Sequence, residues 1–172
     1  MEEQKLIAAC KANDRLAQQL LYNRYANAMF TISYRITKDR ELAADVLQEA
    51  FVRVFHYIYT FRGESTLGAW IKTIVVRSAL AILKKEKKEL SFDISIADES
   101  PTNMHFSHDI DYLENAILSL PSGYRTVFLL IEVEGYTHQD VADLLGVSVG
   151  TSKSQLFYAK KRLRELISPK ME

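Results

Sequence analysis

The sequence predicts an all-α fold made of two helical domains joined by an irregular acidic linker. Apolar residues recur at steps of three to five along most of the 172 residues, as they do on one face of a helix. Three prolines and six glycines are too few for the many turns of an all-β fold. Residues 90–108 lose the helical pattern and contain Ser, Asp, Asn and Pro, so we interpret them as a linker between domains at 1–89 and 109–172.

Three helices are expected in the first domain. Asp14 is placed to cap the first, whose predicted inward stripe is Leu16, Leu20, Tyr25, Met29, Ile32 and Ile36. A second helix is expected after Asp39, with an inward stripe of Leu42, Val46, Ala50, Val54 and Ile58. Residues 61–66 break the periodicity, and a third helix is expected from about Leu67, with an inward stripe of Trp70, Ile71, Ile74, Val75, Ser78 and Ile82.

The second domain begins with a short predicted helix over residues 109–118. Pro121 fits the first turn of the next helix, and Gly135 fits its C-terminal stop. Residues 137–163 then follow a helix-turn-helix pattern, in which the caps and turn residues are Thr137, Gly146, Val147 and Ser148. The last helix is expected to reach about Ile167.

The last helix of this pattern has two chemically different faces. Leu156, Ala159 and Leu163 are expected to be buried, with Leu166 or Ile167. A second face, made of Lys153, Ser154, Phe157 and Lys161, combines two ammonium groups, a hydroxyl and an aromatic ring. Ammonium groups neutralise phosphates, and a hydroxyl or a ring can contact base edges in the major groove. This face therefore predicts DNA binding.

The formal net charge of zero hides an uneven distribution. Residues 61–90 carry seven basic and three acidic residues, residues 91–134 carry one and eight, and residues 135–172 carry six and four. The single cysteine, Cys10, cannot form an internal disulfide, which is expected of a protein in a reducing cytosol. No electropositive group is clearly placed beside Cys10, so a role as a redox sensor has little support. No apolar run approaches the roughly 20 residues that cross a bilayer, and the N-terminus lacks a signal-peptide pattern. We expect a cytoplasmic protein without membrane insertion.

The predicted second helix carries an outward stripe of Asp45, Gln48, Glu49 and Val52, at i, i+3, i+4 and i+7. No nucleophile or histidine is placed beside these carboxylates, so acid–base catalysis has little support, and no cofactor is expected. The basic third helix and the segment before it have the composition to bind a phosphate backbone and an unpaired base.

These motifs resemble one family. Residues 34–88, YRITKDRELAADVLQEAFVRVFHYIYTFRGESTLGAWIKTIVVRSALAILKKEKK, resemble region 2 of bacterial sigma-70-type initiation factors. The segment LPSGYRTVFLLIEVEGYTHQDVADLLGVSVGTSKSQLFYAKKRLREL resembles region 4 of the same factors. A chain of this length with these two regions alone is similar to the extracytoplasmic-function (ECF) group, so the resemblance implies a non-enzymatic subunit that directs RNA polymerase to promoters and opens the DNA.

The resemblance also implies partners and site residues. Docking onto the β′ coiled coil of core polymerase would fall to Asp45, Gln48, Glu49 and Val52. Reading and opening the −10 element would fall to Phe61, Arg62, Ser65, Thr66, Lys72, Arg77, Ser78 and Lys84. Reading the −35 element would fall to Ser148, Thr151, Lys153, Ser154, Gln155, Phe157, Tyr158 and Lys161. The β flap of polymerase and an anti-sigma factor are further implied partners, and the acidic linker resembles a segment threaded toward the polymerase active-site channel.

The chain departs from the family pattern in places. The family often has an acidic residue at the position of Ala44 and Asn near Ser78, and it usually has a β-branched residue at Ser152 and Arg at Gln155. Because Gln prefers adenine where Arg prefers guanine, the last difference predicts a different promoter sequence.

Two other classes of function remain open from the sequence. A stand-alone helix-turn-helix regulator with an N-terminal sensing or dimerisation domain would explain residues 137–163 but not the outward stripe or the 61–85 segment. An enzyme or metal site would have to use His105, His108, Asp109 and Asp111, whose spacing resembles ligand spacing only loosely.

Overall fold

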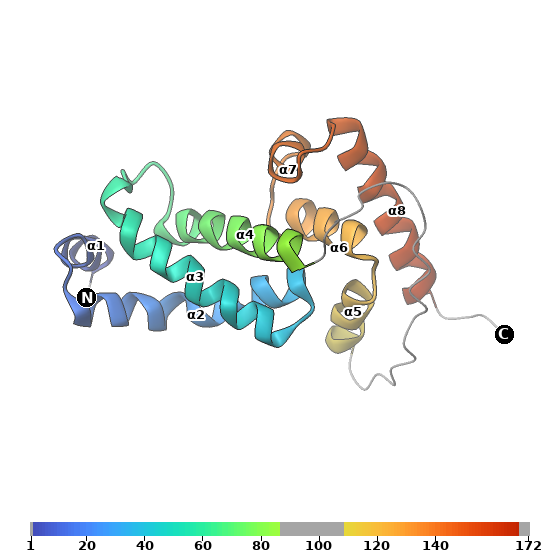
Figure 1. Cartoon of the computed structure of the whole chain (residues 1–172). Coiled ribbons are helices and arrows are strands. Elements are labelled where there is room, and N and C mark those ends of the chain that lie inside the picture. Colours follow the sequence, from blue (N-terminus) through green and yellow to red (C-terminus); the bar gives the residue numbers. More distant parts are fainter. Residues whose placement is uncertain (1, 87–108, 169–172) are drawn as a thin grey trace. The chain divides into compact units, whose positions relative to one another are not determined.

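The computed structural model describes residues 2–86 and 109–168, which are helical with no strand among them (Figure 1). The chain divides into two compact units, residues 1–86 and 87–172. The predicted all-α class with two helical domains is confirmed. The predicted linker at 90–108, and with it His105 and His108, lies outside the described residues.

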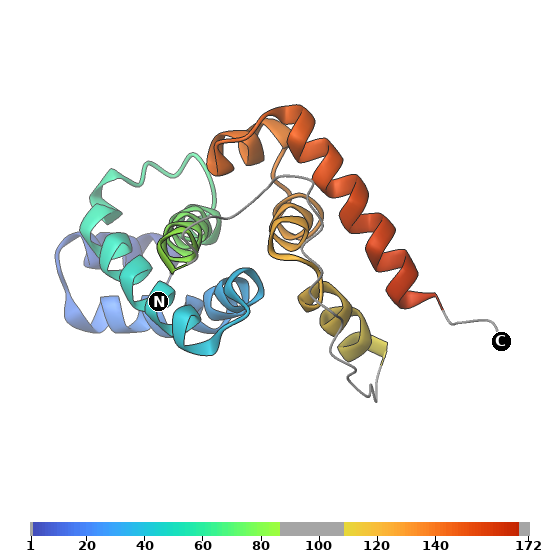
Figure 2. The same ribbon diagram turned by 45° about the vertical axis from the view of Figure 1, so that its right-hand side comes forward.

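Unit 1 is built on three helices that pack against one another, with a short N-terminal helix added. Its elements are α1 (Glu3–Lys11), α2 (Arg15–Thr37), α3 (Arg40–Tyr57), the 3₁₀ turn η1 (Ile58–Thr60) and α4 (Leu67–Glu86). Each pair among α2, α3 and α4 is in contact, and α1 lies on α2 and η1. Figure 2 looks nearly along α4, the green helix, and shows α2 and α3 beside it.

The predicted cap at Asp14 and the predicted start of a helix after Asp39 are both confirmed. One carboxylate oxygen of Asp14 accepts hydrogen bonds from the amides of the first turn of α2, and Asp39 does the same for α3. Only two residues separate these helices, and Lys38 makes the reversal in the left-handed conformation, with a φ of 56°. The local sequence therefore fixes where both long helices begin.

The buried face of α2 differs from the predicted one at its N-terminal end. Leu16 is 77% exposed and Leu20 is also exposed, whereas Ala17 and Leu21 are buried. The predicted stripe was thus shifted by one residue, about 100° around the helix. Farther along α2 the prediction is correct for Met29 and Ile36. The core of unit 1 is completed by α3 and α4 side chains such as Val46, Ala50, Val54, Ile71, Val75, Ala79 and Leu83.

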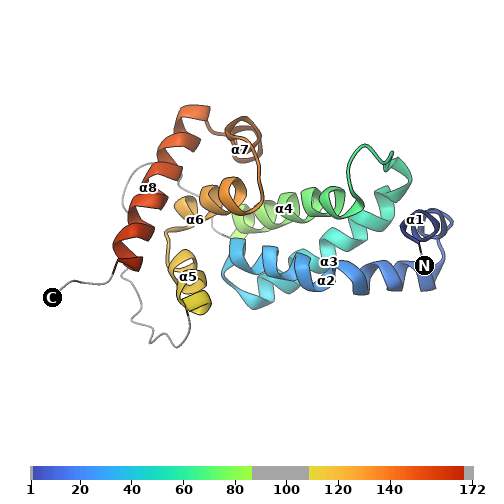
Figure 3. The same cartoon turned by 180° about the vertical axis from the view of Figure 1, so that it is seen from behind.

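Unit 2 contains the predicted series of short helices. They are α5 (Asp109–Leu118), α6 (Ser122–Phe128), the π-helical turn η2 (Leu129–Val133), α7 (His138–Leu145) and α8 (Val149–Ile167) (Figure 3). The predicted stop at Gly135 is confirmed by its φ of +78° and by the hydrogen bond from the amide of Tyr136 to the Leu130 carbonyl. Pro121 lies at the N-cap of α6, one position before the predicted first turn.

An arginine lies in the core of unit 2. The side chain of Arg125 is 1% exposed and donates hydrogen bonds to the carbonyls of Leu118 and Leu120, at 3.5 and 2.8 Å, where the chain turns from α5 into α6. It thereby satisfies backbone acceptors that the turn would leave unpaired. The buried apolar side chains of unit 2 include Val127, Leu130, Val141, Ala159 and Leu163.

Candidate nucleic-acid and protein interfaces

The helix-turn-helix of unit 2 has every boundary set by a local interaction. Thr137 and Asp140 form a reciprocal capping box at the start of α7, and the side chain of Ser148 accepts a hydrogen bond from the Thr151 amide at the start of α8. Between the helices Gly146 takes a φ of +67°, which a residue with a side chain adopts only with strain. The Val147 amide then bonds the Ala142 carbonyl at 3.0 Å and closes the turn.

The outward face of α8 carries the predicted basic and aromatic side chains. Lys153 and Lys161 are exposed, and the ring of Phe157 between them is 59% exposed. Tyr158 stacks on Tyr124 of α6, with ring centroids 6.1 Å apart. Two further predicted residues, Thr151 and Ser154, are less exposed to solvent, because both are half-buried. The hydroxyl of Ser154 also donates a hydrogen bond to the Thr151 carbonyl.

Gln155 is a correction to the sequence prediction. Its side chain is 1% exposed, so it is not available to a base edge in this conformation. Gln155 belongs to the buried face of α8 together with Ser152, Leu156 and Ala159, at helical spacing. A buried Gln155 cannot contact a base directly, so the predicted preference for adenine at this position does not follow.

A polar contact inside the helix-turn-helix was not predicted from the sequence. Ser152 is fully buried, and its hydroxyl lies 2.8 Å from Nδ1 of His138, the first residue of α7. This hydrogen bond joins the two helices one residue before Lys153. The sequence signal was the departure from the family's β-branched residue at Ser152, which could have prompted a search for a polar partner.

The segment before α4 forms an exposed loop, residues 62–66, which we call the capture loop. Arg62, Ser65 and Thr66 are all exposed. The hydroxyl of Thr66 accepts a hydrogen bond from the Ala69 amide at 3.2 Å and so takes part in starting α4. On α4 itself, Arg77 and Lys84 are exposed and Lys72 is half-buried.

Two predicted DNA-contacting residues of unit 1 are buried instead. The ring of Phe61 is tucked against Trp70, with centroids 5.5 Å apart, and Phe61 is 9% exposed, so it is not placed to stack on a base. Ser78 is fully buried because it lies on the inward stripe of α4, and its hydroxyl has no hydrogen-bond partner among residues 2–86 and 109–168. Both assignments to DNA contact were wrong for this conformation.

The outward stripe of α3 is exposed as predicted from its helical spacing. Asp45 and Gln48 are exposed, Glu49 is half-buried and paired with Arg53, and the apolar side chain of Val52 is 65% exposed. A single exposed apolar side chain among polar ones is common on protein surfaces, so this stripe is available to a partner but does not by itself define a binding site.

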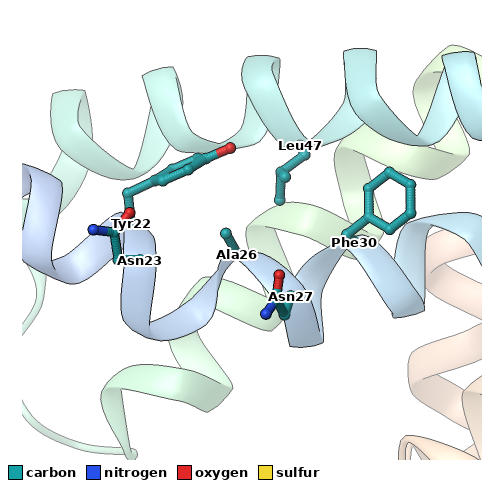
Figure 4. Close-up of a pocket in the computed structure, with 6 residues that line it drawn as sticks. All are labelled: Tyr22, Asn23, Ala26, Asn27, Phe30 and Leu47. Atoms are coloured by element: carbon teal, nitrogen blue, oxygen red, sulfur yellow. The ribbon is translucent and has the colours of Figure 1, made fainter.

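A shallow groove lies beside this stripe, between α2 and α3. Its volume is about 420 Å³, and Figure 4 shows its lining residues, Tyr22, Asn23, Ala26, Asn27, Phe30 and Leu47. Leu47 directly precedes Gln48 of the stripe. The lining contains two amides and apolar or phenolic groups, but no acid, base or thiol nucleophile, so the groove does not have the composition of a catalytic site.

Within the described ranges 2–86 and 109–168, no group of three or more His, Cys, Asp or Glu side chains is arranged to hold a metal ion. No helix in this part of the chain is long and apolar enough to cross a membrane.

Comparison with known proteins identifies the class. Residues 21–89 match the family description of Sigma-70 region 2, and residues 110–163 match that of Sigma-70, region 4. Both regions therefore occur in the order expected from the motifs, one in each folded unit. The chain belongs to the sigma-70 family of RNA polymerase initiation factors.

The curated relatives narrow the class to one group. The chain is 28% identical to an ECF RNA polymerase sigma-E factor of Haemophilus influenzae, over 99% of this chain and 98% of that one. It is 27% identical to the RNA polymerase sigma-H factor of Pseudomonas aeruginosa, over 98% and 95% of the two chains. The protein is an ECF-type sigma factor.

Solved structures share the fold. A sigma factor RpoE in complex with the anti-sigma factor NepR, from Bartonella quintana, matches with a TM-score of 0.58 and 23% identity, covering 87% of this chain and 95% of that one. The structure of CnrH in complex with the cytosolic domain of CnrY matches with a TM-score of 0.56 and 18% identity, covering 96% of each chain.

Proposed function

We propose that this sigma factor binds the core of RNA polymerase in the cytoplasm and directs it to promoters, with unit 1 at the −10 element and unit 2 at the −35 element. It acts by binding and performs no catalysis of its own. The observation that carries the proposal is the occurrence of both sigma regions, in order, on two separately folded units.

The −35 element is assigned to the exposed face of α8. Lys153 and Lys161 supply positive charge for phosphates, and the exposed ring of Phe157 between them can contact a thymine methyl group. Ser148 and Thr151 lie at the N-terminus of this helix, where recognition helices contact base edges. Lys160 makes a useful comparison because it is on the same helix but is paired with Glu132 of η2.

The −10 element is assigned to the capture loop and α4. The loop presents Arg62, Ser65 and Thr66 to solvent at the head of a helix whose exposed cations include Arg77 and Lys84. An unpaired base can hydrogen-bond to the loop while the cations follow the strand's phosphates. Trp70, in the first turn of α4, is half-buried and packs on Phe61, the residue before the loop.

Polymerase binding is assigned to the outward stripe of α3, in contact with the β′ coiled coil, and unit 2 is assigned to the β flap. Val52 supplies apolar area, and Asp45 and Glu49 supply charge that selects a basic partner. An anti-sigma factor is proposed as the inhibitor. In one solved structure of the same fold, the sigma factor RpoE is in complex with the anti-sigma factor NepR. In another, CnrH is in complex with the cytosolic domain of CnrY.

The function is tested by run-off transcription with purified bacterial core polymerase over a genomic promoter library. Specific transcripts that depend on this chain are expected, and they also reveal the recognised sequence. Lys153→Ala should lower transcription from those promoters about five- to tenfold without changing core binding. Lys160→Ala, which removes the same charge from the same helix, should have a smaller effect. Equal losses in the two variants would refute the assignment of Lys153.

Core binding is tested separately. Glu49→Lys should weaken binding to core polymerase at least about tenfold, because it reverses a charge at the centre of the stripe. Since Glu49 is paired with Arg53, Asp45→Lys serves as a second variant that leaves this ion pair intact. Glu2→Lys makes the same charge change at the exposed N-cap of α1, where Glu2 is paired with Lys5, and is the control. Wild-type affinity in both stripe variants would refute the proposed polymerase interface.

A further inference from the structure

The N-terminal helix α1 is connected to both ends of the capture loop. This helix, Glu3–Lys11, precedes residues 21–89, which match sigma region 2, and it has no role in the functions assigned above. It is packed into unit 1, because Leu6 and Cys10 are fully buried and α1 contacts both α2 and η1. A polar residue at each end of α1, Glu3 or Lys11, forms a hydrogen bond with a residue that lies at, or packs against, one end of the loop.

The first contact is made at the start of the loop. Nζ of Lys11 donates a hydrogen bond to the backbone carbonyl of Phe61 at 2.9 Å, across fifty positions of sequence. The amide of Phe61 donates to the Ile58 carbonyl at 3.1 Å, and its ring packs on Trp70. Phe61 is therefore fixed through its carbonyl, amide and side chain, which explains why this aromatic residue is buried.

The second contact is made at the end of the loop, through Tyr25. Its hydroxyl donates to the carboxylate of Glu3, at the other end of α1, at 3.3 Å. The ring of Tyr25 lies against Gly68 in the first turn of α4, where an added Cβ would be only 3.1 Å from the ring. Tyr25 thus lies between α1 and the helix that begins directly after the loop.

The loop between these two points has few contacts of its own. Residues 62–66 are all exposed, and Gly63 has a φ of +79°, with no described residue other than its chain neighbours within 4 Å of where its Cβ would lie. A short exposed segment of this kind loses conformational entropy when it closes on a ligand, and fixing its ends in advance lowers that cost.

We propose that α1 positions the capture loop for binding an unpaired promoter base, and that Lys11 and Tyr25 are the positioning residues. The proposal rests on the assignment of this loop to the −10 element. Lys11 sets the position of the first end of the loop and Tyr25 that of the second, and neither residue has to touch DNA. Residues before the region 2 match therefore contribute to promoter opening.

The test measures how a holoenzyme, assembled from core polymerase and this chain, binds a fluorescent single-stranded oligonucleotide. The oligonucleotide carries the non-template −10 sequence of a promoter recovered by run-off transcription. Lys11→Met and Tyr25→Phe, which remove only the ammonium or the hydroxyl, should each weaken binding about fivefold. Lys11→Arg should restore binding, because it retains a donor of similar reach. Lys5→Met, on the same helix in an exposed ion pair with Glu2, is the control and should bind as wild type.

Two further measurements separate positioning from a general loss of structure. Core binding should be the same in all variants, and equal losses of core and oligonucleotide binding in Lys11→Met would overturn the proposal. Alkylation of the buried Cys10 thiol reports whether α1 stays docked. If Lys11→Met and Tyr25→Phe bind the oligonucleotide like wild type, the proposal is overturned whether or not Cys10 becomes reactive. A wild-type chain that gives no specific transcripts would instead overturn the proposed function itself.

Discussion

The hydrogen bond between His138 and Ser152 gives a direct test of how the helix-turn-helix is held together. Ser152→Ala removes the hydroxyl from a fully buried position and takes away the partner of a half-buried imidazole nitrogen 2.8 Å away. Loss of such a bond, with one polar group left behind, costs about 1–2 kcal/mol. For a domain of this size each kcal/mol lowers the melting temperature by roughly 4–8 °C. We therefore expect unit 2 of the variant to melt about 4–16 °C below the wild type.

The two units can be followed separately in the intact chain. The single tryptophan, Trp70, lies in α4 of unit 1, so its fluorescence reports unit 1, while far-ultraviolet circular dichroism reports both units. Ser152→Ala should leave the Trp70 transition unchanged. The double variant with His138→Ala should cost less than the two single changes added together, because they remove the same bond. A fall below about 2 °C, or additive single changes, would refute the reasoning.

Three other predictions concern buried or capped residues. Burial, and to a lesser degree Asp14, raises the pKa of the Cys10 thiol, so iodoacetamide should modify it at least tenfold more slowly in the folded than in the unfolded chain, by mass spectrometry. Hydrogen bonds from Thr137 lower the pKa of Asp140 below 3.8, so the capping box stabilises α7 above that pH and this contribution is lost as the pH falls through the lowered value. Circular dichroism should show this pH dependence reduced in Asp140→Asn. Arg125→Met should destabilise unit 2 by about 2–3 kcal/mol in urea, because carbonyls at Leu118 and Leu120 lose their donor; a cost below about 1 kcal/mol would contradict this.

Helix boundaries were predictable where one residue determines them. Asp14, Thr137 and Ser148 cap the helices as predicted, because the capping interaction is made within three residues. The helix expected after Asp39 also begins there, and Asp39 caps it. By contrast, α1 was not predicted. It buries only Leu6 and Cys10, and a single i, i+4 pair carries too little periodicity to define a helix.

Which face of a helix is buried was predicted less well, since neighbouring elements decide it. Leu20 and Leu21 are adjacent and equally apolar, and the packing of α2 against its neighbours selects Leu21. For Gln155 the spacing from Ala159 already indicated the inner face, but the resemblance to a DNA-contacting family position favoured the outer one. Residue type alone also could not show that the ring of Phe61 packs on Trp70 and is not exposed to stack on a base.

The division of the molecule into two units with separate cores affects how the protein can evolve. The side chains assigned to −35 DNA project from α8, whose buried face packs within unit 2, while the −10 assignment draws only on unit 1. Substitutions at Lys153 or Phe157 therefore leave the packing of the other unit untouched, and their energetic effects should add to those of changes in the capture loop. During evolution, such a protein could therefore change the −35 sequence that it recognises while its recognition of the −10 sequence stayed the same.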